Sequence, residues 1–403
     1  MKRRAVLRGL VAAGGASALS ACLDVQGETE IPTGDPPNRP DRQHAWNELL
    51  DTDEHGNPRL PEQHVFLSIS YDGDDRERDR RVLEDALTDL ETAYEASNRG
   101  LVFTVGYSPA YFERFDESID ADLPRPKRLL DSENIATDES DLFLHLASDH
   151  ASVVLEVREA LFGDHDANGV EITTLDGLFS LENRRSGFIG GGLPAQQGNL
   201  LGVPEKAVDS SAPTFMGFRA GFKQNQATED RVTLTDGRFA GGTTMHVERL
   251  RHVLDEWFER SLDGQVARLF AGELGGETVG ERGENLTDHN GVESVGSDEL
   301  RRRAEEYGVV GHAEKLSRFR EDGRPPIIRR DVNSADNGEA ATLFVGLQRE
   351  FSDYKKLRLA MEGKTLAEEN LVGERRENGI LQYIRTRERG NFLIPPRELR
   401  ALP

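Results

Sequence analysis

The sequence predicts an α+β protein made of two ferredoxin-like halves that pack through their antiparallel sheets. Three observations support this prediction. Short runs of apolar, β-branched and aromatic residues alternate with amphipathic stretches of helical period. In the first half these elements follow the order β-α-β-β-α-β, which is that of a ferredoxin-like unit. The second half repeats the order with insertions, although the two halves share no evident sequence identity.

The first half contains four predicted strands, one short helix and two longer helices. Its apolar runs end at polar or glycine-containing segments, which are typical of turns. Strands are predicted at residues 64–71, 101–107, 142–146 and 169–177, and helices at residues 77–96, 109–115 and 153–161. The first helix is amphipathic, and its apolar face comprises Val82, Leu83, Ala86, Leu87, Leu90, Ala93 and Tyr94.

Loops precede the second half. Residues 178–230 are rich in Gly, Asn and Gln, which predicts long ordered loops. Beyond them, strands are predicted at residues 242–249, 326–330, 342–348 and 392–394, and helices at residues 253–260, 263–271, 351–361 and 364–372. The charged, glycine-rich residues 272–298 favour a solvated surface over a metal site. The body therefore divides into an N-terminal half (61–180), a loop region (181–240) and a C-terminal half (241–403).

The composition excludes several classes of protein. The 403 residues include 73 acidic and 50 basic ones, a net charge of −23, and such a surface repels nucleic acid. The single cysteine excludes an intrachain disulfide. Only 8 of the 50 basic residues are Lys. Many carboxylates with little Lys indicate a halophilic protein, because concentrated salt screens surface repulsion; the alternative is an ordinary acidic protein.

The N-terminal segment has the features of a targeting signal rather than of a folded domain. The pair Arg3-Arg4 precedes a weakly apolar stretch, residues 10–19, and the run ends at Cys22 in the segment Leu-Ser-Ala-Cys. This arrangement resembles a twin-arginine export signal with a lipobox. The resemblance implies a signal peptide over residues 1–21, lipid on Cys22 and an anchor on the outer face of the cytoplasmic membrane; a plain secretory signal is the alternative. Residues 22–60, polar and proline-containing, are expected to form a disordered tether.

Several segments of the body carry a family resemblance by their content and order. They are Phe103–Arg114, Ser140–Asp149, Gly217-Phe-Arg-Ala-Gly221, Gly241–Arg251 with Trp257 and Ser261–Gln265, the pair Gly311-His312 lying 17 residues before Arg329, and Phe344–Arg349. Together they resemble the dye-decolourising peroxidases (DyP), haem proteins of the dimeric α+β barrel class. The resemblance covers roughly residues 64–397 and implies one haem b per chain.

The resemblance makes His312 the expected ligand of the haem iron. Haem iron takes a neutral imidazole on one face, and a hydrogen bond to the other ring nitrogen sets its basicity. His246 and His252 are rival candidates, while His145 in the third strand is expected to be a core or interface residue. For any of these histidines the alternative is a residue that serves packing alone.

Arg329 is the expected distal arginine. A permanently charged group with five donors can bind peroxide and stabilise the charge that develops as the O–O bond breaks. Arg330 is the adjacent alternative, and since neighbours on a strand face opposite sides, at most one of the two points at the iron. The ordinary alternative is a strand-end arginine paired with an acid. The resemblance also places Gly217, Gly221, Phe344 and Leu347 at the haem.

One position departs from the family pattern. The segment 217–221 falls where the family has its GxxDG loop, and Ala220 replaces the aspartate that moves a proton between the peroxide oxygens. Glu229 and Asp230 follow nearby, but nothing in the sequence places them over the haem. Peroxidase activity is therefore expected to be weak, even though the two glycines of the loop are kept.

The leading hypothesis is an exported, lipid-anchored haem protein that uses H2O2 for one-electron oxidation of a small-molecule reductant. A homo-oligomer is compatible with this hypothesis. The second hypothesis is a catalytically silent binding or scaffold lipoprotein on the same fold, suggested by Ala220. A third is a solute-binding lipoprotein for a transporter, which the tether fits but the order of elements does not.

Overall fold

The computed structural model describes residues 30–403 apart from 55, 131–132, 198–199, 220–224, 287–289 and 293. The predicted signal peptide and Cys22 lie outside the described residues, as do Ala220 and Gly221. Among the residues that are described, no helix has the length and apolar character needed to cross a bilayer.

The first half is a ferredoxin-like unit, as predicted. Its elements are β1 (Gln63–Tyr71), α3 (Arg76–Ala93), β2 (Val102–Tyr107), α4 (Pro109–Arg114), β3 (Ala136–Asp138), β4 (Leu142–Ser148), α5 (Ala151–Leu161) and β5 (Phe179–Phe188). The four long strands lie in the order β2-β4-β1-β5 and are antiparallel to their neighbours. With α3 after β1 and α5 after β4, this is the arrangement of the β-α-β-β-α-β unit.

The second half repeats the same arrangement with more helices inserted. It comprises α6 (Glu229–Val232), β6 (Thr243–His252), α7 (Asp255–Phe258), α8 (Leu262–Leu269), α9 (Gly276–Val279), α10 (Ser297–Tyr307), α11 (His312–Ser317), β7 (Ile328–Arg329), β8 (Val332–Ser334), β9 (Ala341–Gln348), α12 (Phe351–Glu362), α13 (Lys364–Glu368) and β10 (Ile384–Ile394). Short 3-10 turns lie at Pro36–Asn38, Pro194–Gln197, Asp336–Gly338, Leu381–Tyr383 and Arg397–Leu399. The strand order β8-β9-β6-β10 is equivalent to that of the first half, so the predicted duplication is confirmed at the level of topology.

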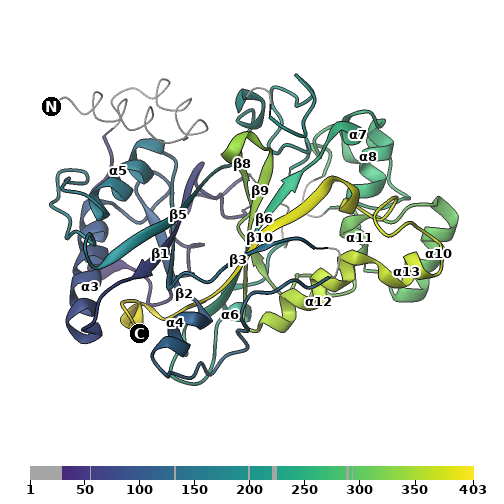
Figure 1. The fold of residues 1–403 in the computed structure, drawn as a ribbon. Helices are drawn as coiled ribbons and strands as arrows, with labels where there is room; N and C mark the ends of the chain where they lie inside the picture. Colours follow the sequence, from purple (N-terminus) through teal and green to yellow (C-terminus); the bar gives the residue numbers. More distant parts are fainter. Residues whose placement is uncertain are drawn as a thin grey trace.

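The two halves join into one closed sheet. Phe188 of β5 pairs with Asn333 of β8, and Leu393 of β10 pairs with Tyr107 of β2, so both outer edges of each half are used. The pairing is antiparallel throughout, except where β3 runs parallel to β10. Figure 1 shows the strands in the middle and the helices of the two halves on opposite outer sides. The predicted α+β architecture of two packed halves is thus confirmed.

Alternation along the strands separates the core into layers. On β1, Val65, Leu67 and Ile69 belong to the cluster that packs against α3 and α5. Phe66, between them, belongs to a second cluster inside the closed sheet, to which Phe392 of β10 also contributes. Successive side chains of a strand point to opposite faces, so a single strand serves both clusters.

One strand prediction was wrong, and another was correct but too short. The predicted strand at 169–177 is irregular, and β5 lies instead at Phe179–Phe188, inside the predicted loop region. The strand predicted at 392–394 is the end of the longer β10. Both observed strands carry many charged residues, so they lack the apolar signal of a buried strand; pairing with β1 and β6 holds them. The helices α6, α9, α10 and α11 and the short strands β3 and β8 were not predicted.

The last part of the predicted tether belongs to the folded body. Trp46 is only 2 % exposed and donates from Nε1 to the carbonyl of Gln43 at 3.0 Å. Gln43 in turn accepts from the backbone of Val105 at 2.9 Å and donates to the carbonyl of Pro395 at 2.9 Å. These contacts tie the stretch around residues 43–46 to strands of both halves, which a disordered tether does not do.

Candidate functional site

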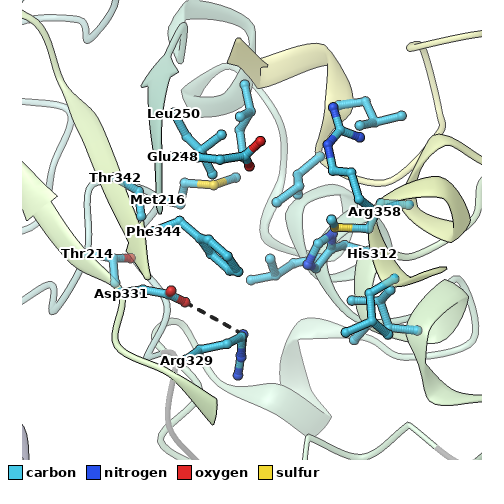
Figure 2. A pocket seen from close by; sticks show the side chains of 18 of the residues that line it. Thr214, Met216, Glu248, Leu250, His312, Arg329, Asp331, Thr342, Phe344 and Arg358 are labelled. Atoms are coloured by element: carbon cyan, nitrogen blue, oxygen red, sulfur yellow. Dashed lines mark ion pairs between the residues drawn. The ribbon is translucent and has the colours of Figure 1, made fainter. Parts of the chain in front are cut away.

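A cavity of about 410 Å³ lies in the second half, between the strands β6 and β9 on one side and the helices α11 and α12 on the other. This volume is in the range of small-molecule sites, roughly 300–1,000 Å³. Figure 2 shows Asp331 and Phe344 facing His312 across the cavity, with Arg329 beside Asp331. The cavity therefore brings together residues of strand ends and of a helix start that are distant in sequence.

The start of α11 fixes the position of His312. Gly311 precedes the helix, and a Cβ atom at this position would lie 1.9 Å from the carbonyl oxygen of Phe270. The Gly311 N–H donates to the Glu314 carboxylate at 3.1 Å, and the Glu314 N–H donates to that Phe270 carbonyl at 3.1 Å. Only glycine permits so close an approach, so the helix begins against the backbone of α8's end with His312 as its first residue.

The imidazole of His312 is available as a ligand. Neither ring nitrogen has a hydrogen-bond partner among the described residues, although the cavity wall surrounds the ring. Burial, followed by the positive charges of Lys315, Arg329 and Arg358, lowers the pKa of His312 to about 3. The ring is therefore neutral at ordinary pH and keeps a nitrogen lone pair that can bind a metal.

Arg329 lines the opposite part of the cavity. Its backbone is held by Gln226, whose Oε1 accepts from the Arg329 N–H at 2.7 Å and whose Nε2 donates to the Arg329 carbonyl at 3.2 Å. Arg330 points to the other side of the strand, where its guanidinium lies 3.7 Å from the Trp46 ring centroid and donates to the His44 carbonyl at 2.6 Å. Of these two neighbours, the structure places only Arg329 at the cavity.

Asp331 is the neighbour of Arg329 on the same wall. The Arg329 Nη1 atom lies 3.8 Å from the Asp331 Oδ2 atom, which is an ion-pair distance but too long for a hydrogen bond. The Asp331 Oδ1 atom is shielded from solvent and has no hydrogen-bond partner among the described residues. Burial raises the pKa of Asp331 to about 6, against the opposing effect of Arg329. This carboxyl group thus titrates close to neutral pH.

Of the remaining residues expected at the haem, some line the cavity and others do not, and alternation along β9 explains the difference within that strand. Phe344 and Thr342 of β9 line the cavity. Leu347 does not: it is fully buried in the cluster inside the closed sheet, because a residue three positions after Phe344 faces the other side. Gly217 has a φ of 93° between Met216 and Phe218, which line the cavity, without lining it itself.

The rival histidines lie in different surroundings. His252 lines the cavity, shares a 3.0 Å hydrogen bond with Thr342 Oγ1, and has a pKa that burial lowers to about 4. His246 is held away from the cavity by a 2.6 Å hydrogen bond with Asn391 Oδ1 and by stacking on the Tyr354 ring. His145 is a core residue that shares a hydrogen bond with His64, as expected from its strand. Glu229 and Asp230, at the start of α6, do not line the cavity.

The charge of the cavity is opposite to that of the chain. The arginines that line it are Arg219, Arg320, Arg329, Arg358, Arg375, Arg385 and Arg387, and the carboxylates are Glu133, Glu248 and Asp331. Arg375 donates to the carbonyls of Leu381 and Ile384, and Arg385 donates to carbonyls of the same turn. Burial, followed by repulsion from Arg385, lowers the pKa of Arg375 to about 10. In a chain of net charge −23, such a wall favours an anionic ligand.

Two of the three carboxylates belong to a buried ion-pair network. Arg389, which is fully buried, donates to Glu248 at 2.8 Å and to Glu133 at 2.9 Å, and Arg358 donates to Glu133 at 2.9 Å. Burial alone raises the pKa of Glu248, but the His246 imidazole, whose Nε2 atom lies 3.5 Å from Glu248 Oε1, and the positive charges of Arg389 and Arg358 outweigh it and bring the pKa to about 2. These two acids are therefore fully engaged, which leaves Asp331 as the third.

Sequence reasoning missed Asp331 and this network. A signal for Asp331 was present, since alternation places residues two apart on the same side and Asp331 follows Arg329 by two. Glu248 lies in the strand β6, most of whose residues are buried. A charged residue at such a position indicates an ion-pair partner or a functional site. The partner of Glu248 is Arg389 of β10, which also donates to Glu133, and no local pattern predicts that meeting.

Comparisons with known proteins identify the family of the chain and the proteins that share its fold. A family model described as a family of unknown function, DUF7405, matches residues 61–396. No curated protein matches the sequence. Among solved structures, a dye-decolorizing peroxidase from Bacteroides thetaiotaomicron VPI-5482 is 15 % identical, with 88 % of this chain and 98 % of that chain covered and a TM-score of 0.56.

Two further structures give the same result. A variant of DypB from Rhodococcus jostii RHA1 in complex with heme is 16 % identical, with 89 % and 98 % of the two chains covered and a TM-score of 0.57. The encapsulated DyP-type peroxidase from Mycobacterium smegmatis is 17 % identical, with 86 % and 96 % covered and a TM-score of 0.55. The resemblance drawn from the sequence is thus confirmed for the fold. The chain belongs to DUF7405, a family of unknown function, and it has the fold of the DyP-type peroxidases.

Proposed function

We propose that this protein binds haem b, one per chain, in the cavity of its second half and uses H2O2 to oxidise a small reductant by one electron at a time. The observation that carries the proposal is the unpartnered, neutral imidazole of His312 facing Arg329 and Asp331 across the cavity. The fold supports it, because one of the similar DyP structures is described as a complex with heme.

The residues of the cavity fit a haem group. His312 supplies one free nitrogen for the iron. Phe344, Met216 and Leu250 supply apolar surface for the porphyrin. Haem also carries two carboxylates, and Arg375 with its neighbouring arginines offers cationic groups whose described hydrogen bonds go to carbonyls rather than to acids.

The chain's own residues then have separate tasks. Haem, when bound, supplies the two electrons that reduce H2O2 and regains them one at a time from the reductant. His312 holds the group in place, and Arg329 donates hydrogen bonds to H2O2 and to the negative charge that develops on the departing oxygen. Phe344 and the apolar wall exclude water from the reacting atoms, which strengthens these electrostatic interactions.

A titration with haem tests the proposal. The purified protein is expected to develop a Soret absorption band, and His312→Ala is expected to change or abolish it. His252→Gln is the matched control, because His252 is the other described histidine that lines the cavity. A band that is unaffected by the first variant and lost in the second would assign the ligand to His252. Absence of any band would defeat the proposal.

The second candidate function is ligand binding without turnover. Ala220 favours it, because alanine at the position of the family's acid can neither accept nor give a proton. This candidate predicts no peroxide-dependent oxidation of any dye, with or without added haem. Measurable oxidation that depends on haem and on Arg329 would contradict it. The closed single sheet gives no support to a solute-binding protein of two doubly wound lobes.

We further propose that the chain is exported through the twin-arginine pathway and held on the outer face of the cytoplasmic membrane by lipid on Cys22. The motif at Arg3-Arg4 and the segment before Cys22 support this proposal. Replacing the arginine pair by lysines should leave the protein inside the cell. Cys22→Ser should allow export but release the protein from the membrane fraction, and a membrane-bound Cys22→Ser protein would refute the lipid anchor.

A further inference from the structure

We propose that Asp331 is the proton-transfer residue of this cavity, and that its carboxyl group takes over the task that Ala220 cannot perform. The inference deepens the proposed function and rests on it. It concerns one acid of this chain that the family pattern did not indicate. Three properties of Asp331 support the proposal: the position of its carboxyl group, the absence of other hydrogen-bond partners, and its charge state.

The position of Asp331 is that of a group able to act on a ligand held by Arg329. Both residues lie on the wall opposite His312, with 3.8 Å between Nη1 and Oδ2. At this distance the two groups attract each other without a direct hydrogen bond, so a small molecule with both donors and acceptors can bind to both. H2O2 is such a molecule. The side chain of Asp331 lines the cavity and is 22 % exposed.

Asp331 is also the one described cavity carboxylate that no hydrogen bond engages. Glu133 accepts from Arg389 and Arg358, and Glu248 accepts from Arg389. The Oδ1 atom of Asp331 is buried without a partner, and Oδ2 has only the longer contact with Arg329. Leaving a buried carboxylate without hydrogen bonds costs free energy, so a purely structural acid at this position would be expected to have found a donor.

The charge state of Asp331 suits the task. Burial raises its pKa to about 6, and Arg329 is the group that opposes this rise. The other charged or titratable groups that face the cavity are Glu133, Glu248, His252, Tyr354, Arg219, Arg320, His312, Arg358, Arg375, Arg385 and Arg387. None of these is a cause of the shift, so the carboxyl group responds to its own burial and to one neighbour. An acid with a pKa near 6 can both accept and return a proton near neutral pH.

The proton step balances within the peroxide. With haem bound to supply the two electrons, deprotonated Asp331 would accept at Oδ2 the proton of one peroxide oxygen and would then deliver it to the other oxygen. That oxygen already carries one hydrogen, so when the O–O bond breaks it leaves as water with the bonding electron pair. Asp331 ends the step as it began, deprotonated. Arg329 donates to the departing oxygen but keeps its proton.

The first test reads the titration of Asp331 without haem or turnover. Infrared spectra of the protein between pH 4 and pH 8 are expected to show a C=O band of a protonated carboxylic acid that disappears around pH 6. Asp331→Asn should remove this band. The matched control is Asp336→Asn, because Asp336 is another aspartate whose pKa burial raises, but it does not line the cavity. A band that survives in Asp331→Asn would overturn the proposal.

The second test uses the haem-loaded protein. Asp331→Asn should leave the Soret band unchanged but slow the reaction with H2O2 by about 100-fold or more, the usual size of a lost acid–base group. Asp331→Glu should restore part of the rate with a shifted pH dependence, which a merely structural residue would not do. A normal rate in Asp331→Asn, with haem bound, would overturn this inference alone. A protein that binds no haem would overturn both this inference and the proposed function.

Discussion

The guanidinium of Arg329 and the carboxylate of Asp331 lie 3.8 Å apart on the wall of the cavity that faces His312. The backbone geometry that brings them together is simple, since residues two apart in extended chain share a side. The backbone of Arg329 is in turn held by Gln226. Burial of the Asp331 carboxylate costs stability, the charge of Arg329 opposes that cost, and such costs are typical of functional sites.

The stability cost of Asp331 gives a first prediction. Its pKa is about 6 in the folded protein and near 3.8 in an unfolded chain. Between these values the folded protein binds a proton that the unfolded chain has released, so the free energy of unfolding falls as pH rises through this window. Asn carries no charge. Asp331→Asn should therefore be more stable than the parent at pH 8, by at most about 3 kcal/mol for a shift of about two units.

Urea denaturation of both proteins at pH 3.5 and pH 8 measures the effect. The gain in unfolding free energy of Asp331→Asn over the parent should be present at pH 8. It should be absent at pH 3.5, where the carboxyl group of the parent is protonated in both the folded and the unfolded state. Asp74→Asn is the control, because the Asp74 side chain is 97 % exposed and its replacement should change stability at neither pH. An equal gain at both pH values would show that the variant acts through packing rather than charge.

Gly311 provides a second prediction. A Cβ atom there would lie 1.9 Å from the Phe270 carbonyl oxygen, so Gly311→Ala must displace the start of α11 and His312 with it. The expected cost is about 1–3 kcal/mol of unfolding free energy, as for other overpacked sites, together with weaker haem binding. Gly296 is the matched control, because it also precedes a helix, α10, and has no atom within 4 Å of its added Cβ.

Both properties can be measured on the same two variants. Gly296→Ala should lose less than about 1 kcal/mol, the scale of a changed helix cap, and should bind haem as the parent does. Thermal unfolding gives the stability, and absorption titration with haem gives the affinity. Equal effects of the two substitutions would contradict the close approach of Gly311 to Phe270 as the reason for its glycine.

The buried network around Arg389 gives a third prediction. Arg389 is fully buried between Glu248 and Glu133, so Arg389→Leu leaves both carboxylates without their main cation. Breaking one partner of a buried ion pair costs about 3–5 kcal/mol. Arg302, which pairs with Glu299 on the exposed face of α10, is the control, and Arg302→Ala should change stability far less than Arg389→Leu, because solvent screens an exposed ion pair.

Chemical denaturation of these two variants distinguishes a buried network from surface charge. The Arg389 variant should also show a reduced affinity for haem, because Glu248 and Glu133 both line the cavity and would be repositioned. A similar loss of unfolding free energy in both variants would mean that Arg389 and its two carboxylate partners are solvated in the folded protein.

The sequence predicted the elements whose apolar residues alternate or repeat at helical spacing, and failed where pairing alone holds a strand. The strands β1, β2 and β4 are buried along their length and were predicted within two residues at each end. By contrast, β5 and the first part of β10 are half-exposed and charged, so only their ladders with β1 and β6 define them.

The same reasoning explains the candidate site. His312 and Arg329 were selected by a resemblance of order and spacing, and both line the cavity. Leu347 was selected from the same strand as Phe344, but an odd separation along a strand puts two residues on opposite faces. Asp331 was not selected because its significance depends on the absence of hydrogen-bond donors around it, which is a property of the folded surroundings and not of the sequence.

The acidic surface gives a last prediction. The chain has a net charge of −23 and only 8 Lys among 50 basic residues, so repulsion between surface carboxylates opposes folding at low salt. At about 1 M salt the Debye length falls to about 3 Å, which screens exposed charges but not the buried pairs around Arg389. The urea midpoint should therefore rise steeply between about 0.1 M and 2 M KCl. The rise should shrink near pH 4, where many surface carboxylates are protonated and repel less. A midpoint with the same salt dependence at both pH values would mean that salt acts through apolar burial, and the acidic composition would then have no role in salt tolerance.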